Sequence, residues 1–262
     1  MRVAFTVCDE VRPLFRANGL DRFEALSAGD IGKKLRCERG GRELRRIVLN
    51  GDGGPEVFYL KRLGPEPVLL LARALLSGQV PHCGPLRELA IIQLLQQKGF
   101  AVMTPVAWGE QRRFGFPVCG FLVVREVCGE DVAQLYAASQ AHDRLALLEE
   151  VGQLTGRLHA AGFYQAVRLK DLIRDCNSGQ LVLIDRETSK PRLSRFSKNQ
   201  AVATLARASR RTLRDGHRFG AATLRHFLLG YCKGVAGAWS ISPDAMRRLM
   251  LSRLRHELGR RD

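Results

Sequence analysis

The sequence contains no two cysteines separated by two residues, the spacing that structural zinc sites commonly use. Its cysteines number seven, an odd count, and they are scattered along the chain. This pattern argues against both a zinc site and a disulfide framework. We therefore expect the protein to be in the reducing cytoplasm.

Long apolar runs are also missing. The first ten residues include Asp9 and Glu10 and therefore leave no apolar signal segment. The most apolar run, residues 68–76, is interrupted by Arg73 and falls far below the ~20 residues that a membrane span needs. We therefore expect any contact with a membrane to be peripheral.

Acidic residues are few relative to basic ones, with 26 Asp and Glu against 42 Lys and Arg and a formal net charge of +16. Such a surplus favours partners rich in phosphate, among them nucleic acid, anionic lipid and phosphorylated sugar. The arginines are not interleaved with stacking aromatics, and no RNA or DNA motif stands out. The alternative of a nucleic-acid-binding protein is therefore supported only by the net charge.

The first half of the chain is rich in β-strand signals. Residues 44–49 and 56–63 are β-rich runs joined by a strong turn signal at 50–55, which predicts a hairpin. Residues 86–98 have helical apolar spacing that ends at Gly99. Two further apolar runs, 101–108 and 120–126, are predicted as strands, with a polar stretch between them.

The second half is predicted to be mainly helical, because residues 141–161, 223–233 and 243–258 carry apolar stripes. A short strand is expected at 179–185. At 262 residues the chain can bury a sizeable core and suits two closely packed lobes. We expect an α+β fold with a first lobe at 1–127 and a second at 128–262.

Three residues in this order suit a nucleotide. Lys61 on a strand can neutralise phosphate oxygens, Glu88 on the next helix can hold its ammonium, and Asp185 at a strand end can coordinate Mg²⁺. Each residue alone also has an ordinary reading, as a solvated edge charge, an exposed helix acid or a turn residue. Their order and context favour the nucleotide.

The segments around these residues resemble the lipopolysaccharide core kinases, the family that phosphorylates Kdo or heptose. Residues 57–62 resemble its lysine strand, 84–89 its glutamate helix, and 99–111 the segment that follows. Residues 158–164 look like the helix that leads into the catalytic loop, and 183–186 like the metal-binding strand end. No single segment is specific to the family, but the order of these segments between Phe23 and Lys233 is specific to it.

The resemblance implies a protein-kinase-like two-lobed fold that uses ATP and Mg²⁺. Its first lobe would hold an antiparallel sheet and one main helix, and its second lobe would be mostly helical. Lys61 would contact the nucleotide phosphates, Glu88 would pair with Lys61, and Asp185 would hold the metal. Residues 29–46 would form the hairpin that covers the phosphates. There Lys33 and Lys34 either assist in binding phosphate or belong to a solvated basic loop.

The catalytic loop departs from this family. The family usually has His, any residue and Asp, with Asn or His about five positions after that Asp, whereas this chain has Gln165, Val167 and Leu172. The interval from Val167 to the expected metal ligand Asp185 is 185 − 167 = 18 residues, which is usual between the catalytic base and the metal ligand of kinase-like phosphotransferases. This interval supports the alignment of Val167 with the base. Valine cannot accept a proton, and general-base assistance is worth about 10²–10⁴-fold in rate. Asp171 is a candidate for a relocated base, although 185 − 171 leaves only 14 residues.

Two functions follow from the resemblance. One is ATP-dependent phosphorylation of a Kdo or heptose sugar of the lipopolysaccharide inner core, weak or with a relocated base. The other is a pseudokinase, a scaffold that binds the lipopolysaccharide core, another phosphorylated glycolipid, an anionic membrane surface or a partner kinase or glycosyltransferase. His159, on a helix before Gly162, is interpreted as structural.

Overall fold

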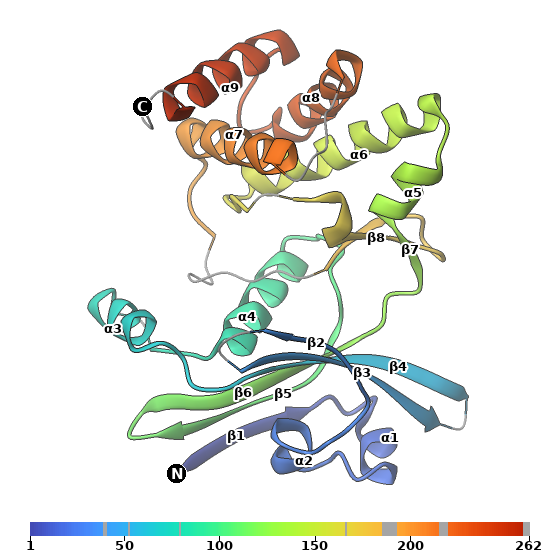
Figure 1. The fold of residues 1–262 in the computed structure, drawn as a ribbon, viewed down its shortest axis with the longest axis vertical. Helices are drawn as coiled ribbons and strands as arrows, with labels where there is room; N and C mark the ends of the chain where they lie inside the picture. The colour runs from blue at the N-terminus through green and yellow to red at the C-terminus, as the bar shows by residue number, and fades with distance from the viewer. Residues whose placement is uncertain are drawn as a thin grey trace. The chain divides into compact units, whose positions relative to one another are not determined.

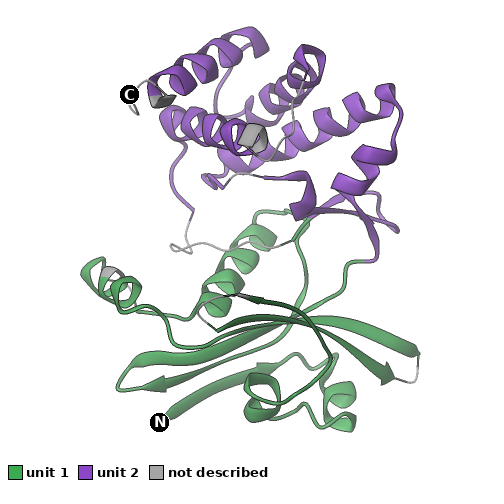
Figure 2. Cartoon of the chain, in the orientation of Figure 1, with its two compact units in different colours: residues 1–127, 183–192 green, residues 128–182, 193–262 purple. Residues whose placement is uncertain are grey.

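The computed structural model describes residues 1–38, 41–51, 53–78, 80–165, 167–184, 193–214 and 220–258. The chain forms two compact units (Figure 2). Unit 1 comprises Met1–Val127 and Leu183–Arg192, and unit 2 comprises Cys128–Val182 and Leu193–Asp262. Leu183 belongs with unit 1 because its N–H donates to the carbonyl of Ala101 and its carbonyl accepts from the N–H of Met103.

Unit 1 is built on a six-stranded sheet with the order β1-β5-β6-β4-β3-β2 (Figure 1). All of its described strand pairs are antiparallel. The predicted hairpin is confirmed, because β3 and β4 pair from Glu43↔Arg62 to Gly51↔Gly54. The strands are β1 (Arg2–Val7), β2 (Lys33–Glu38), β3 (Arg42–Gly51), β4 (Gly54–Leu63), β5 (Pro105–Arg113) and β6 (Phe116–Arg125).

The strand predicted at 101–108 was misplaced. Strand β5 begins at Pro105 and runs on through the polar residues to Arg113. It is paired there on both sides, with β6 and with β1, a strand that we did not predict. Gly109 does not end the strand. It lies where an added Cβ would come within 2.9 Å of the rings of Phe23 and Phe121, so its missing side chain leaves room for these aromatics.

The main core of unit 1 lies on one face of this sheet, where α1 (Arg12–Ala17) and α2 (Phe23–Ser27) cover it. Phe58 and Leu60 of β4 point into this core and have no exposed surface. The rings of Phe15 and Phe58 meet edge to face at 5.4 Å. Because side chains alternate along a strand, Lys61 points to the opposite face.

That opposite face carries α4 (Gly84–Gln97), which confirms the helix predicted at 86–98. The side chain of Cys83 does not cap the helix. Instead, the carboxylate of Glu110 accepts from the Cys83 N–H at 2.7 Å, and that of Glu66 accepts from the Gly84 N–H at 2.6 Å. Both carboxylates are buried. They satisfy amides at the helix start and place negative charge at its positive end, which fixes the first turn and Glu88 with it.

Unit 2 is mainly helical, as expected. The helices predicted at 141–161, 223–233 and 243–258 are confirmed as α6, α8 and α9, whereas α5 and α7 were not predicted. The strand expected at 179–185 is shorter and covers only Leu181–Leu183. The elements are β7 (Gly129–Asp131), α5 (Val132–Ala138), α6 (Ala141–Ala160), the 3₁₀ turn η1 (Leu169–Asp171), β8 (Leu172–Asp175), β9 (Leu181–Leu183), α7 (Lys198–Arg214), α8 (Ala221–Val235) and α9 (Pro243–Leu258).

Helices α6 and α8 approach each other closely along a seam of glycines. Gly152 and Gly156 of α6 face Gly230 and Gly234 of α8, each pair one turn apart. A Cβ at any of these four positions would overlap a backbone carbonyl of the other helix. The seam therefore requires residues without side chains.

Among the described helices, which include α3 (Val68–Leu76) in unit 1, none is long and apolar enough to cross a membrane.

Candidate functional site

Strand β4 and helix α4 bring Lys61 and Glu88 together. The Lys61 Nζ lies 2.5 Å from the Glu88 Oε1, with side chains that are 20% and 5% exposed. Lys61 is flanked by Leu44 on β3 and Leu122 on β6, so the ion pair lies over an apolar part of the sheet. Breaking a buried pair by removing one partner costs about 3–5 kcal/mol. Each residue therefore fixes the other.

The two lysines of β2 lie on different faces of the sheet. Lys33 is opposite Arg46, which shares a face with Leu44 and therefore with its cross-strand partner Lys61. Lys34 points the other way and forms an ion pair with Glu43 at 3.2 Å. The hydrogen bond to Glu43 raises the pKa of Lys34. Of the two lysines, Lys33 is therefore the one that shares the face of Lys61.

Asp185, the predicted metal ligand, lies outside the described residues, and the strand before it ends at Leu183. Within the described part of the chain, no group of three or more His, Cys, Asp and Glu residues could hold a metal. The Lys61–Glu88 pair suits the phosphates of a nucleotide, but the described side chains do not complete a metal site.

The loop after α6 carries apolar side chains at two of its three altered positions. Val167 is half-buried, and Leu172, the first residue of β8, has no exposed surface. Hydrogen bonds hold the start of this loop, since the Gly162 carbonyl accepts from both the N–H and the hydroxyl of Ser194. Leu172 belongs to the interior of unit 2 and offers no ligand to a metal or a substrate.

Asp171 is held by Arg168. The Oδ2 of Asp171 accepts from the Arg168 Nε at 2.9 Å, and its Oδ1 accepts from a terminal guanidinium nitrogen at 2.8 Å. The side chain of Asp171 is 6% exposed. A bidentate pair of this kind is strong and geometrically specific, and here it closes the 3₁₀ turn. The pair therefore fixes the orientation of the Asp171 carboxylate within the turn.

The sequence did not single out Arg168, although its spacing of three residues from Asp171 in the catalytic loop was a usable signal.

His159 is buried in unit 2 between α6 and α8. Its Nδ1 lies 3.0 Å from the hydroxyl of Tyr231. Burial lowers the pKa of His159 to about 3, so the imidazole is neutral near pH 7. This placement supports the structural interpretation of His159.

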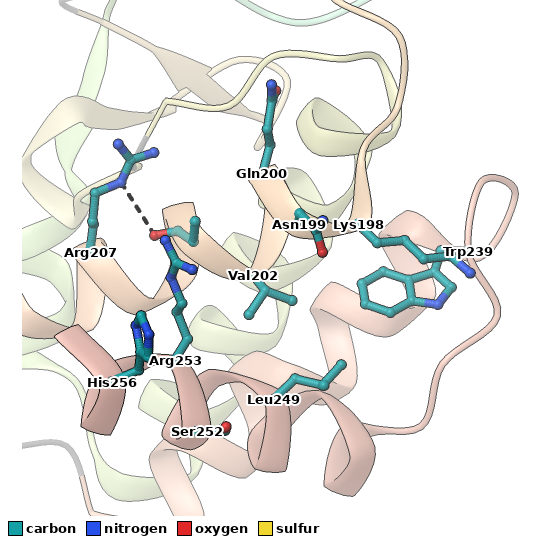
Figure 3. Close-up of a pocket in the computed structure, with 11 residues that line it drawn as sticks. Lys198, Asn199, Gln200, Val202, Arg207, Trp239, Leu249, Ser252, Arg253 and His256 are labelled. Atoms are coloured by element: carbon teal, nitrogen blue, oxygen red, sulfur yellow. Dashed lines mark hydrogen bonds between the residues drawn. The ribbon is translucent and has the colours of Figure 1, made fainter.

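A groove lies between α7 and α9 in unit 2 (Figure 3). It encloses about 820 Å³, and none of the described residues that line it is acidic. The Nζ of Lys198 lies 5.5 Å from the ring centroid of Trp239. The guanidinium of Arg207 donates to the Ala203 carbonyl at 3.3 Å (Figure 3). The other basic side chains of this basic groove are Arg253 and His256.

Comparison with known proteins adds to this geometry. Residues 56–230 match the Lipopolysaccharide kinase (Kdo/WaaP) family, a range that begins in the lysine strand β4 and ends within α8. The chain belongs to this family. A kinase family uses ATP, generally with a divalent metal.

One curated relative is the lipopolysaccharide core heptose(I) kinase WaaP of Pseudomonas aeruginosa. It is 30% identical over 151 residues, which make up 55% of this chain and 54% of the relative. The chain therefore matches this family member over about half of its length.

A solved structure, WaaP in complex with acyl carrier protein, covers 99% of this chain and 99% of its own, with a TM-score of 0.65 and 20% identity. The similarity confirms the predicted kinase-like two-lobed fold. Unit 1 supplies the antiparallel sheet with α4, and unit 2 is mostly helical.

Proposed function

We propose that the protein binds ATP and phosphorylates a Kdo or heptose sugar of the lipopolysaccharide inner core at a reduced rate. The observation that carries this proposal is the Lys61–Glu88 ion pair at 2.5 Å. It has the geometry that a kinase fold uses on nucleotide phosphates. It occurs in a chain that has Val167 where its family has the base.

In this proposal Lys61 binds the nucleotide phosphates and Glu88 orients the Lys61 ammonium. Lys33 approaches the phosphates from the same face of the sheet, whereas Lys34 stiffens the hairpin through Glu43. When bound, ATP supplies the phosphoryl group. Asp185 is the proposed ligand of the divalent metal, which we take to be Mg²⁺.

The rate is reduced because no described carboxylate of the loop is ready to accept a proton. Val167 cannot act as a base, and the two oxygens of Asp171 are engaged by Arg168. Losing the base costs about 10²–10⁴-fold in rate. Phosphoryl transfer depends mainly on positioning and charge neutralisation, so some turnover remains. Asp171, held in the turn by Arg168, is the candidate for the relocated base.

The second candidate function is a pseudokinase that binds or scaffolds components of core assembly. The basic groove between α7 and α9 favours it, because cationic side chains line it together with Trp239 and no described lining residue is acidic. Such a surface suits a phosphorylated core oligosaccharide or glycolipid, or an acidic face on a partner kinase or glycosyltransferase.

We further propose that the protein acts at the cytoplasmic face of the inner membrane as a peripheral protein. Helix α3 exposes apolar side chains, with Val68 79%, Leu69 62% and Leu76 88% exposed. Exposed apolar clusters mark contact sites. A net charge of +16 adds attraction to anionic lipid headgroups.

A transfer assay separates the two functions. Purified protein is incubated with Mg-ATP and core oligosaccharide, and phosphate on the sugar is measured against an Asp185→Ala control. Transfer above this control supports the enzyme, and Val167→Asp should raise the rate by about 10²–10⁴-fold. Transfer no higher than the control, together with Mg-ATP binding, would assign the protein to the pseudokinases.

A further inference from the structure

Two cysteines face each other at the start of unit 2. Strands β7 and β8 pair antiparallel with Gly129 opposite Asp175. Cys128 and Cys176 are the next residues outward on the two strands, and the Cys176 N–H donates to the Cys128 carbonyl at 2.9 Å. The two residues are therefore direct cross-strand neighbours.

This position matches the geometry of a disulfide. Residues opposite each other in an antiparallel ladder have Cα atoms about 4.5–5.5 Å apart, and disulfides join Cα atoms about 4.4–6.8 Å apart. Both Cys128 and Cys176 are exposed. The Cys128 side chain also raises the pKa of the Cys176 thiol, in keeping with their position across the ladder. The ladder thus places the two residues within the range of Cα separations that a disulfide spans.

The other cysteines lack such a neighbour in the described strands. Cys37 lies opposite Glu43 and Cys119 lies opposite Gln111. Burial raises the pKa of Cys83, which is fully enclosed. Cys37 is exposed like the facing pair but stands alone, which makes it a matched control.

We propose that Cys128 and Cys176 form a reversible disulfide that links β7 to β8 when the protein meets a low-molecular-weight disulfide such as oxidised glutathione. One cysteine thiolate attacks a sulfur of oxidised glutathione, which forms a mixed disulfide and releases one glutathione thiolate. The second cysteine thiolate then attacks the protein sulfur of the mixed disulfide and releases a second glutathione thiolate. The protein loses two thiol protons, and one oxidised glutathione is reduced to two thiols.

The link would tie together segments that surround the altered loop. Cys128 is the first residue of unit 2, and Cys176 directly follows β8, the strand that begins at Leu172. The closed loop contains α5, α6 and the turn with Asp171. A disulfide restricts the unfolded chain more strongly when it closes a longer loop. Oxidation should therefore stabilise unit 2 and hold the loop with Val167 closer to one conformation.

The test uses the purified full chain, treated with oxidised glutathione and then freed of it. Titration of thiols in denaturant should show two fewer than the seven of the reduced protein, and peptide mapping should find the peptides of Cys128 and Cys176 joined. The midpoint of thermal unfolding should rise by several degrees on oxidation and return with dithiothreitol.

Two variants decide the assignment. Cys128→Ser should abolish both the joined peptide and the rise in unfolding midpoint, whereas Cys37→Ser should keep both. The proposal is overturned if Cys128 and Cys176 each end as a separate glutathione adduct. It is also overturned if the joined peptide contains other cysteines, or if the Cys128→Ser protein still gains stability on oxidation.

Discussion

At the scale of single residues, the proposed site separates the groups that would bind a nucleotide from the groups that would move a proton. Lys61 and Glu88 form an ion pair on the sheet and α4. The loop position of the base holds Val167, and Leu172 is buried. Charge neutralisation and proton acceptance are distinct contributions to phosphoryl transfer, so the first can persist without the second.

Mg-ATP should raise the thermal unfolding midpoint of the wild-type protein, because a ligand that binds only the folded state stabilises it. Lys61→Ala should remove most of this shift, since it deletes the cation that meets the phosphates. Lys34→Ala makes the same change in charge on the other face of the sheet and should keep the shift. An unchanged shift in Lys61→Ala would show that our nucleotide site is misplaced.

His159 should make stability depend on pH in an acidic window. Its folded-state pKa of about 3 lies below the unfolded value of about 6.5, so between these values the unfolded chain binds a proton that the folded chain excludes. The free energy of unfolding should fall as pH falls through this window, by at most about 1.4 kcal/mol per pH unit. Denaturant titrations at several pH values measure it.

His159→Gln should flatten this part of the profile, whereas substitution of the exposed His142 by Gln should not. Equal slopes in the wild type and the His159→Gln variant would show that the imidazole is accessible to protons in the folded protein.

At the scale of secondary-structure elements, the glycine seam between α6 and α8 shows how strongly one helix constrains another. Alanine usually stabilises a helix over glycine by about 0.5–1 kcal/mol. At Gly156 a Cβ would overlap the carbonyl of Tyr231 and crowd the amide of Val235. Because of this packing, we expect alanine at Gly156 to destabilise the protein, although intrinsic helix propensity alone predicts that it would stabilise it.

Gly156→Ala should lower the free energy of unfolding by about 1–3 kcal/mol, because overpacking forces the helices apart. Gly237, which has no atom within 4 Å of an added Cβ, provides the control. Gly237→Ala should be neutral or slightly stabilising. Chemical denaturation measures both changes, provided that the dependence of the unfolding free energy on denaturant concentration is the same in the variants and the wild type. A Gly156→Ala protein as stable as wild type would contradict the close approach of the helices.

Elements with a strong local pattern could be predicted from the sequence. The hairpin of β3 and β4, helix α4 and the three apolar-striped helices are specified by turn residues and periodicity. The extent of β5 could not be predicted in this way, because its polar second half is held by β1 and β6. The number and identity of neighbouring strands is not a local property of the sequence.

The candidate site likewise has features that the sequence predicted and features that it did not. The order of Lys61 and Glu88 indicated their pairing, but the face that Lys34 occupies depends on the register with β3. The anchoring of α4 by Glu66 and Glu110 joins residues 18 and 27 positions apart. Such contacts depend on the assembled sheet, so spacing along the chain does not reveal them.

At the scale of the whole molecule, the excess of positive charge and the apolar surface of α3 would act together in the proposed contact with a membrane. Attraction between basic side chains and anionic lipid weakens with salt, whereas burial of leucine side chains does not. Binding to anionic vesicles should therefore fall as salt rises but retain an apolar contribution.

The double variant Leu69→Asp/Leu76→Asp should reduce affinity for anionic vesicles by about tenfold or more, because burying one leucine is worth about 1.5–3 kcal/mol. Val48→Asp introduces one charge at a half-exposed position on the sheet and is the control. Vesicle co-sedimentation measures the affinities. If the double variant and Val48→Asp bind alike, α3 does not touch the membrane.

The partial exposure of Lys61 has an experimental consequence. One fifth of its side chain meets solvent while Glu88 holds the ammonium in place, so an ATP-derived acyl-phosphate reagent seated there would acylate the lysine nitrogen. Labelling of this kind reports occupancy and requires neither an acceptor sugar nor turnover. Competition between the reagent and ATP in whole-cell extracts would then measure how much of the protein carries a nucleotide under growth conditions, even if it transfers no phosphate.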